Sequence, residues 1–237
     1  MSKNTGKICV VLSCYKLHDN VLRNFLFMNE TPFTDNGVFT CVVSDVNRPH
    51  LESSSVRIIR YPFPQSVFNF SKTLNFGIRT SLDFDIIIKT DIDICFSDST
   101  IKMCLESVDE SRGLVCLSAH VRSFEEAKKN EPIWPGRLPI QTTGLGACFA
   151  LHKTRWETVY GYNENLNGWG FEDADMLRRA HARSHKVPRS KKTPLFHLRH
   201  SDRKGRFFPH HLQSNQKNSF SVRYINQNWG IPENENS

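Results

Sequence analysis

Residues 85–93 of the chain read DIIIKTDID, an apolar run that leads into two acidic residues. A short continuous apolar run bounded by polar residues is typical of a strand buried on both faces of a sheet. Other segments carry similar strand signals, and between them apolar side chains recur three or four positions apart, as they do in helices. The predicted strands are 7–14 (KICVVLSC), 39–43, 56–61, 85–88 and 114–119, and the predicted helices are 18–29, 69–80, 100–108 and 172 to about 185.

Alternating strands and helices predict an α/β fold with a mostly parallel central sheet flanked by helices. Ligands of such sheets bind beyond the carboxyl ends of the strands. Ser13, Asp45 and the pair Asp91 and Asp93 fall at those ends, which makes them candidate site residues. Residues 122–143 contain three prolines and little periodicity, so we expect a long loop over the sheet.

The composition excludes several classes of protein. A charged fraction of 23% together with 17 Phe and 4 Trp excludes a wholly disordered chain. No apolar run approaches the roughly 20 residues that a spanning helix needs. Residues 1–4 lead straight into a predicted strand without the apolar stretch of a signal peptide, and none of the seven cysteines forms a Cys-x-x-Cys pair. We therefore expect a reduced, cytoplasmic protein, with peripheral membrane attachment left open.

Positive charge is concentrated in one segment. Residues 176–223 hold 13 Lys and Arg and a single acid, Asp202, whereas the rest of the chain is net negative. Such asymmetry indicates either an anionic partner, which could be phosphate groups, nucleic acid or an acidic membrane surface, or simply a solvated basic face.

Two motifs could carry chemistry. In an extended segment Asp91 and Asp93 would face the same side and offer two hard oxygen ligands to Mg²⁺ or Mn²⁺, although a polar strand end that caps a turn has the same pattern. The stretch 168–175, GWGFEDAD, places acids where a helix is expected to begin, which capping alone can explain. Capping does not explain Gly168-Trp169-Gly170, which could present an indole face to a sugar or base.

Together these segments resemble a glycosyltransferase of the GT-A type, most closely the catalytic domain of the β-1,4-galactosyltransferase family, over residues 7 to 203. Four blocks match the family's motifs in the right order. They are 68–77 (FNFSKTLNFG), 90–93 (TDID), 146–175 with its GWGFED core, and 199–201 (RHS).

The resemblance implies a role for each matching residue. Asp173 would be the catalytic base, and Asp93 would bind Mn²⁺ or Mg²⁺ with His200 and His197. The acceptor side would be formed by Glu172 and Trp169 with Gly168 and Gly146, and Trp169 would also contact the donor phosphates. The nucleotide would be bound by Ser13, Asp45, Phe68, Lys72, Asn75 and Asp91. The chain departs from the family where Phe70 replaces an Arg, where Ser13-Cys14-Tyr15 replaces Pro-Phe-Arg, and where Phe171 replaces a Gly.

The predicted function is transfer of a sugar from a UDP-sugar to a hydroxyl, with inversion at the anomeric carbon. The acceptor could be a saccharide, a glycolipid at the cytoplasmic membrane face, or DNA with a hydroxylated base; in the last case Phe207, Phe208, Tyr224 and Trp229 would stack bases. The alternatives are a non-catalytic nucleic-acid-binding protein with a degenerate site, or a nuclease. We expect one domain over 1–229, with a nucleotide-sugar half at 7–120, an acceptor half at 121–203 and a frayed tail at 230–237.

Overall fold

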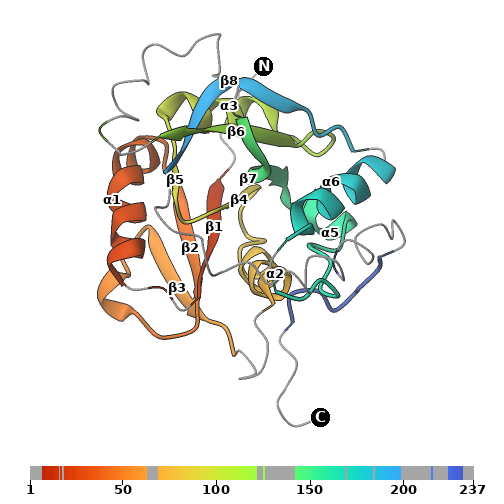
Figure 1. Cartoon of the computed structure of the whole chain (residues 1–237), viewed down its shortest axis with the longest axis horizontal. Helices are drawn as coiled ribbons and strands as arrows, with labels where there is room; N and C mark the ends of the chain where they lie inside the picture. Colours follow the sequence, from red (N-terminus) through yellow and green to blue (C-terminus); the bar gives the residue numbers. More distant parts are fainter. Residues whose placement is uncertain are drawn as a thin grey trace.

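The computed structural model places an eight-stranded sheet, counted over the residues that it describes, between two layers of helices (Figure 1). Those residues are 7–15, 17, 19–62, 69–121, 125, 142–168, 170–183, 185–198, 215 and 224–231. The strands are β1 (Ile8–Cys14), β2 (Phe39–Ser44), β3 (Val56–Arg60), β4 (Ile86–Thr90), β5 (Ile94–Cys95), β6 (Leu114–Val121), β7 (Thr142–His152) and β8 (Arg189–Leu198). The helices are α1 (Asp19–Asp35), the 3-10 turn η1 (Pro49–Leu51), α2 (Phe70–Thr80), α3 (Asp98–Ser107), α5 (Lys153–Thr158) and α6 (Glu172–Ala182).

The sheet has the strand order β3-β2-β1-β4-β7-β6-β8-β5. The first four strands are parallel, β7 runs antiparallel to both of its neighbours, β8 is parallel to β6, and β5 is antiparallel to β8. The predicted α/β class and its parallel strands are confirmed. Strands β5, β7 and β8 and helix α5 were not predicted.

Alternating side chains of the buried strands divide the core into two layers. Val10 and Leu12 pack under α1 and α3, whereas Cys9 and Val11 pack under α2, α5 and α6. Gly77 lets α2 lie close to the sheet, because a Cβ there would come within 2.6 Å of both Val11 and Val43. The strands are therefore buried on both faces, as their unbroken apolar runs predict.

Helix α1 continues to Asp35, beyond the predicted end at residue 29 and past Pro32. Tertiary contacts explain the extension. Phe33 packs against Phe25 and Phe96 with ring centroids 6.1 and 5.4 Å away. The buried Asn29 amide donates to the carbonyl of Ile94, and its oxygen accepts from the Phe96 backbone. These contacts offset the hydrogen bond that a proline removes from a helix.

Candidate active site

The candidate site lies at the carboxyl edge of the parallel strands. Ser13 is the second-last residue of β1, Asp45 directly follows β2, and Asp91 directly follows β4. In the parallel register Ser13 lies beside Val43, one residue before the end of β2. The predicted positions of these residues at the strand ends are therefore confirmed, whereas their predicted binding roles stay predictions.

A buried lysine joins two of the predicted site residues. Lys89 has only 1% of its side chain exposed, and its Nζ lies 3.0 Å from Asp91 Oδ1 and 3.3 Å from Asp173 Oδ1. Tyr162 donates a hydrogen bond of 3.2 Å to Asp173 Oδ1. We call Lys89, Asp91, Tyr162, Glu172 and Asp173 the Lys89 cluster. The fold thus brings the end of β4 against the beginning of α6.

Glu172 and Asp173 occupy the first turn of α6, where the helix dipole favours negative charge. Burial raises the pKa of Glu172 to about 8, helped by the neighbouring Asp173 and opposed by Lys89. Burial also raises the pKa of Asp173, while Lys89 and the Tyr162 hydroxyl oppose that shift. With 20% of its side chain exposed, Asp173 can meet a ligand, whereas Glu172 is buried.

The loop before α6 has an unusual backbone. Gly168 and Gly170 have φ values of 67° and 113°, and Phe171, the N-cap of α6, is left-handed at 69° although it has a side chain. The Gly170 N–H donates to Glu172 Oε2 at 2.6 Å, and the Gly168 carbonyl accepts from the Phe70 N–H at 3.1 Å. The loop is thereby tied to both α2 and α6. Trp169 lies outside the described residues, and Gly146 lies within β7.

A second pair of predicted ligands forms where β5 meets β8. His197 Nε2 lies 2.9 Å from Asp93 Oδ2, and both side chains are largely buried. Antiparallel pairing of β5 with β8 sets this contact, because Ile94 is the register partner of His197. The predicted extended geometry of Asp91 and Asp93 is wrong. The chain turns at residues 92–93, so Asp91 faces Lys89 while Asp93 contacts His197.

The donor set of Asp93 and His197 fits a divalent cation in chemical type, since a carboxylate oxygen and an imidazole nitrogen both bind Mn²⁺ or Mg²⁺. Within the described part of the chain, no group of three side chains is arranged to hold a metal ion. His200, the predicted third ligand, lies outside the described residues. Two of the three predicted ligands are thus in contact with each other, and the metal site itself stays a prediction.

Asp45, at the end of β2, lies beside a buried arginine. Arg48 Nη1 is 3.8 Å from Asp45 Oδ1, and its other nitrogens donate to Asp19 Oδ1 at 2.8 Å and to the Leu17 carbonyl at 2.7 Å. The Asp45 side chain keeps 19% exposure. Arg48 thus holds this strand end in place, and the carboxylate of Asp45 is partly accessible at the predicted nucleotide side.

Other residues predicted at the nucleotide have different surroundings. Asn75 is fully buried, donates to the Tyr162 carbonyl and to Glu164 Oε1, and accepts from the Tyr162 N–H. Because these bonds occupy its amide, Asn75 joins α2 to the loop at 162–164. Lys72 is half-buried in the first turn of α2, and Phe68 lies outside the described residues.

Sequence reasoning missed the role of Lys89, Tyr162 and Arg48. A signal existed for Lys89 alone, since a lysine inside an apolar strand needs a carboxylate partner. Tyr162 and Arg48 lie in irregular segments without periodicity. Their partners are far away in the sequence, so no local pattern indicates them.

The C-terminal residues Tyr224 and Trp229, predicted to stack bases, are only 8% and 4% exposed. The Arg179 guanidinium lies 5.0 Å from the Tyr224 ring centroid, and that of Arg79 lies 5.6 Å from the Trp229 ring centroid. That stacking prediction is wrong for both residues, because protein groups already cover their rings. Phe207 and Phe208 lie outside the described residues.

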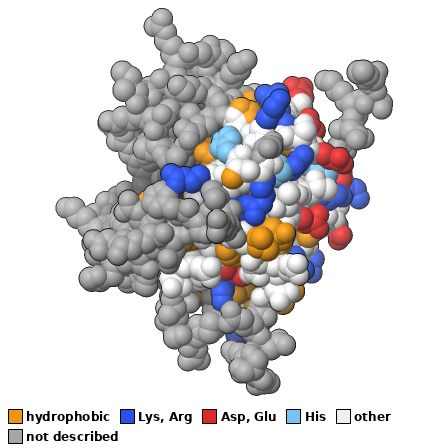
Figure 2. Space-filling view, turned by 90° about the vertical axis from the view of Figure 1, so that its right-hand side faces the viewer, with side chains coloured by type: hydrophobic (Ala, Val, Ile, Leu, Met, Phe, Trp, Pro, Cys, Tyr) orange, Lys and Arg blue, Asp and Glu red, His pale blue; other side chains and the backbone are white. Residues whose placement is uncertain are grey.

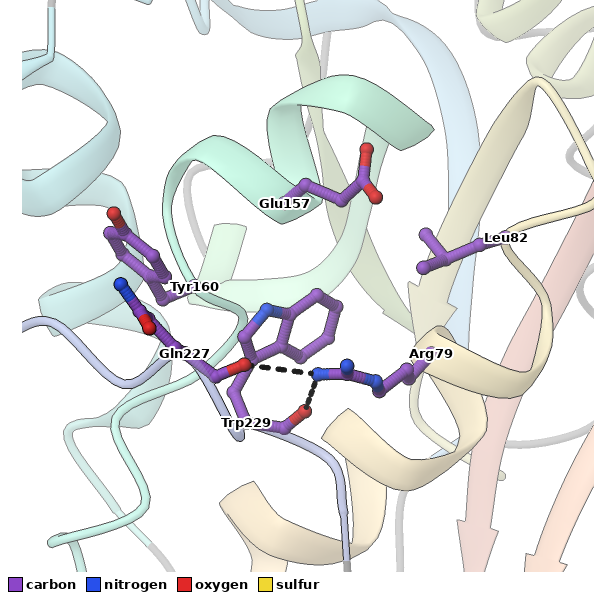
Figure 3. A pocket seen from close by; sticks show the side chains of 6 residues that line it. All are labelled: Arg79, Leu82, Glu157, Tyr160, Gln227 and Trp229. Atoms are coloured by element: carbon purple, nitrogen blue, oxygen red, sulfur yellow. Dashed lines mark hydrogen bonds between the residues drawn. The ribbon is translucent and has the colours of Figure 1, made fainter.

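Trp229 also lines a pocket of about 220 Å³ between the end of α2, α5 and the segment 227–229 (Figure 3). Arg79 donates to the backbone carbonyls of Trp229 at 2.7 Å and Gln227 at 3.4 Å. Its guanidinium is therefore engaged by the protein. The pocket lies at the opposite end of α2 from Phe70, whose ring contacts Lys89.

On the face that lies on the right of Figure 1, the described surface mixes Lys and Arg with Asp and Glu side chains (Figure 2). Much of the basic segment 176–223 lies outside the described residues. None of the helices in the described ranges has both the length and the apolarity that crossing a membrane requires. An anionic partner for the basic segment therefore stays a prediction.

Known proteins share this architecture. Residues 134–201 match a family model described as the N-terminal domain of galactosyltransferase. The catalytic domain of Drosophila β1,4-galactosyltransferase 7 in complex with xylobiose has a TM-score of 0.59 at 15% identity, over 86% of this chain and 75% of that one. A mutant of the Drosophila enzyme in complex with manganese, UDP-Gal and xylobiose has a TM-score of 0.58 at 14% identity, over 93% and 81%.

Staphylococcus aureus TarS is also similar, with a TM-score of 0.56 at 13% identity, over 81% of this chain and 60% of that one. No curated protein matches the sequence. The predicted GT-A fold and the resemblance to galactosyltransferases are confirmed. The chain has the fold of these enzymes, one of which was solved with manganese, UDP-Gal and xylobiose.

Proposed function

We propose that the chain is an inverting glycosyltransferase that moves a sugar from a UDP-sugar to a saccharide hydroxyl and depends on Mn²⁺ or Mg²⁺. The observation that carries the proposal is Asp173. Its carboxylate is partly exposed at the start of α6, 3.3 Å from the Lys89 ammonium and 3.2 Å from the Tyr162 hydroxyl. A carboxylate in such a position can accept a proton from an attacking hydroxyl.

The residues at one end of the site would act on the acceptor, and those at the other end would bind the donor and the cation. Asp173 would take the acceptor's proton, and Glu172, which is buried, would support the acceptor loop by accepting from the Gly170 N–H. Asp45 and Asp91, at the ends of β2 and β4 on either side of β1, would orient the nucleoside. Asp93 and His197, with His200, would hold the divalent cation. A divalent cation at a nucleotide diphosphate stabilises the charge that develops on the leaving group.

A saccharide is the acceptor that the similar structures favour, because the Drosophila galactosyltransferase 7 was solved with xylobiose. Glycolipid and modified-DNA acceptors have no comparable support. The burial of Tyr224 and Trp229 removes two of the aromatic side chains on which the DNA alternative depended. We therefore propose a sugar hydroxyl as the group that attacks the donor.

The test is release of UDP from a panel of UDP-sugars, with and without Mn²⁺ and a panel of saccharide acceptors. We expect one donor to be turned over, chelation by EDTA to stop the reaction, and Asp93→Asn to reduce it strongly. Asp83→Asn, an exposed acid in the turn after α2, is the matched control and should behave like the unmodified chain. Failure of every donor to bind or react with any divalent ion would contradict the proposal and favour a non-catalytic role.

A further inference from the structure

Lys89 lies on a central, fully buried strand of the sheet. It belongs to β4, a central strand whose residues are all buried, and it faces the core layer under α2 and α6 together with Ile87. Lysines are almost never fully buried unless they are paired, because desolvating an ammonium is costly. The position of Lys89 therefore requires a specific electrostatic partner.

The partners are two carboxylates from distant parts of the chain. Lys89 Nζ lies 3.0 Å from Asp91 Oδ1, and 3.3 and 3.5 Å from the two oxygens of Asp173. The Phe70 ring centroid, 5.5 Å away, adds a cation–π contact. Asp91 and Asp173 are 31% and 20% exposed, whereas Lys89 is 1% exposed. The ammonium thus lies in the protein interior, while the carboxylates that it holds reach the accessible edge.

Resting on the proposed function, in which Asp173 is the base, we propose that Lys89 is a positioning residue for that base. Its ammonium keeps Asp173 an ionised carboxylate, directs it toward the acceptor, and joins it to Asp91 at the nucleotide side. A single buried cation would thereby fix the acceptor end of the site relative to the donor end. Lys89 itself would touch neither substrate.

The charge of Lys89 favours this role over a proton-transfer role. Burial alone lowers the pKa of Lys89, but Asp173, Asp91 and Glu172 together raise it above its ordinary value. Lys89 is therefore a stable ammonium at any pH at which the protein works. Such a group cannot act as a base or as an amine nucleophile, since both require the neutral form.

Four ionisable groups face Asp173: Lys89 from β4, Asp91 after β4, Tyr162 from the loop after α5, and Glu172 from α6 itself. Burial and Asp91 favour the protonated acid at position 173, while Lys89 and Tyr162 favour the carboxylate. Removing the ammonium leaves burial and Asp91 opposed only by a hydroxyl. The protonated fraction of Asp173 should then increase.

The experiment compares Lys89→Met with the unmodified chain. Methionine keeps an unbranched apolar stem of similar size and removes the ammonium, with both its charge and its N–H donors. We expect the Asp173 carboxyl pKa, followed by ¹³C NMR of labelled aspartate, to rise by about one unit or more. In transfer assays kcat at neutral pH should fall about 10-fold or more, with a smaller change in KM for the UDP-sugar. The acidic limb of the pH–rate profile should move to higher pH, because the pKa of Asp173 is higher in the variant.

Lys153→Met is the matched control. Lys153 pairs with Asp85 at 3.0 Å, at the opposite end of β4, and is one-third exposed. Removing the Lys153 ammonium should raise the pKa of Asp85 and leave the pKa of Asp173 and kcat unchanged. Lys89→Arg keeps the positive charge, so the pKa of Asp173 should be lower in this variant than in Lys89→Met. If Lys89 only filled space, Lys89→Met should keep more activity than Lys89→Arg.

Should Lys89→Met fail to fold, the reciprocal variant Asp173→Asn tests the same pair. The ¹⁵Nζ resonance of Lys89 should shift in Asp173→Asn and stay in place in Asp85→Asn. An unchanged Asp173 pKa in Lys89→Met, or an unmoved Lys89 resonance in Asp173→Asn, would overturn the inference. If these shifts occur but no UDP-sugar is turned over, the proposed function fails and with it the positioning role of Lys89 in catalysis, while the ion pair itself stands.

Discussion

The two acidic ends of the site differ in where their positive charge comes from. In the Lys89 cluster, Asp91 and Asp173 share an ammonium that the protein itself buries beneath them. At the other end, Asp93 contacts His197, whose imidazole carries a charge only when protonated. The fold thus supplies a permanent cation at the proposed base, whereas the cation that we propose for the Asp93 end would be a dissociable one.

The largest effect should follow from removing the proposed base. Asp173→Asn keeps the shape and the Tyr162 contact but cannot accept a proton, so transfer should slow by about 10²- to 10⁴-fold. UDP binding with Mn²⁺, measured by calorimetry, should change little. A comparable loss of UDP affinity would show that the two ends of the site are not separate in function.

Removing the proposed metal ligand should instead weaken binding of the metal ion. Asp93→Asn should weaken Mn²⁺ binding about 10- to 100-fold, a loss of about 1.4 to 2.8 kcal/mol, because an amide oxygen replaces a carboxylate. Electron paramagnetic resonance of free Mn²⁺ measures this directly. Asp91→Asn, whose carboxylate already has the Lys89 ammonium as a partner, is the comparison and should weaken Mn²⁺ less. Equal losses would mean that the cation lies between the two aspartates.

The Lys89 cluster should also make stability depend on pH. The pKa of Glu172 is about 8 in the folded chain and near 4.5 when unfolded. The folded state therefore holds a proton that the unfolded state has lost, so stability falls as pH rises from about 4.5 to about 8, by up to about 1.4 kcal/mol per pH unit.

Glu172→Gln cannot lose that proton and should lack this part of the slope. Denaturant unfolding of the variant and the unmodified chain at several pH values provides the measurement. Asp175→Asn would not be a suitable control, because Asp175 forms a buried pair with Arg179 at 2.7 Å. Glu157→Gln, which changes an exposed acid, is the matched control. If Glu172→Gln keeps the full dependence of unfolding free energy on pH, Glu172 is not the group responsible.

The smallest effect concerns the backbone that leads into the cluster. Phe171 has a left-handed φ of 69°, which costs a residue with a side chain about 1 to 2 kcal/mol, whereas glycine loses about 0.5 to 1 kcal/mol through the entropy of its unfolded chain. Phe171→Gly should therefore stabilise the chain by up to about 1 kcal/mol in thermal unfolding. Tyr160→Gly, at a φ of 59°, is the comparison. A clear destabilisation at 171 would show that the Phe171 ring makes contacts worth more than the strain.

Much of the first half of the fold could be predicted because its strands are continuous apolar runs and its helices are amphipathic. The strands β1 to β4 and β6 and the helix α2 lie where the pattern placed them. Strand β7 was missed because residues 142–152 contain two glycines and follow a proline-rich stretch, which obscures the strand signal. Strand β5 has only two residues, too few for any period to be recognised.

The candidate site was predictable by residue type more than by arrangement. Asp91, Asp93, Asp173 and His197 were identified as chemically suited, and Asp93 was placed with His197, but Lys89, the partner of Asp91 and Asp173, was not identified. The prediction that Asp91 and Asp93 face the same side of an extended strand is wrong, because the chain turns at residues 92–93. A local periodicity describes a regular strand, and it gives no information once the strand has ended.

The sequence alone determined the α/β layers, the edge at which polar side chains gather and the acids that reach it, because period and burial are properties of short segments. The tertiary structure decided which of those acids acquires a buried cation. Lys89 meets Asp173 across 84 positions of the chain. Such a contact depends on how α6 packs over the sheet, and the residues between the two positions do not encode it locally.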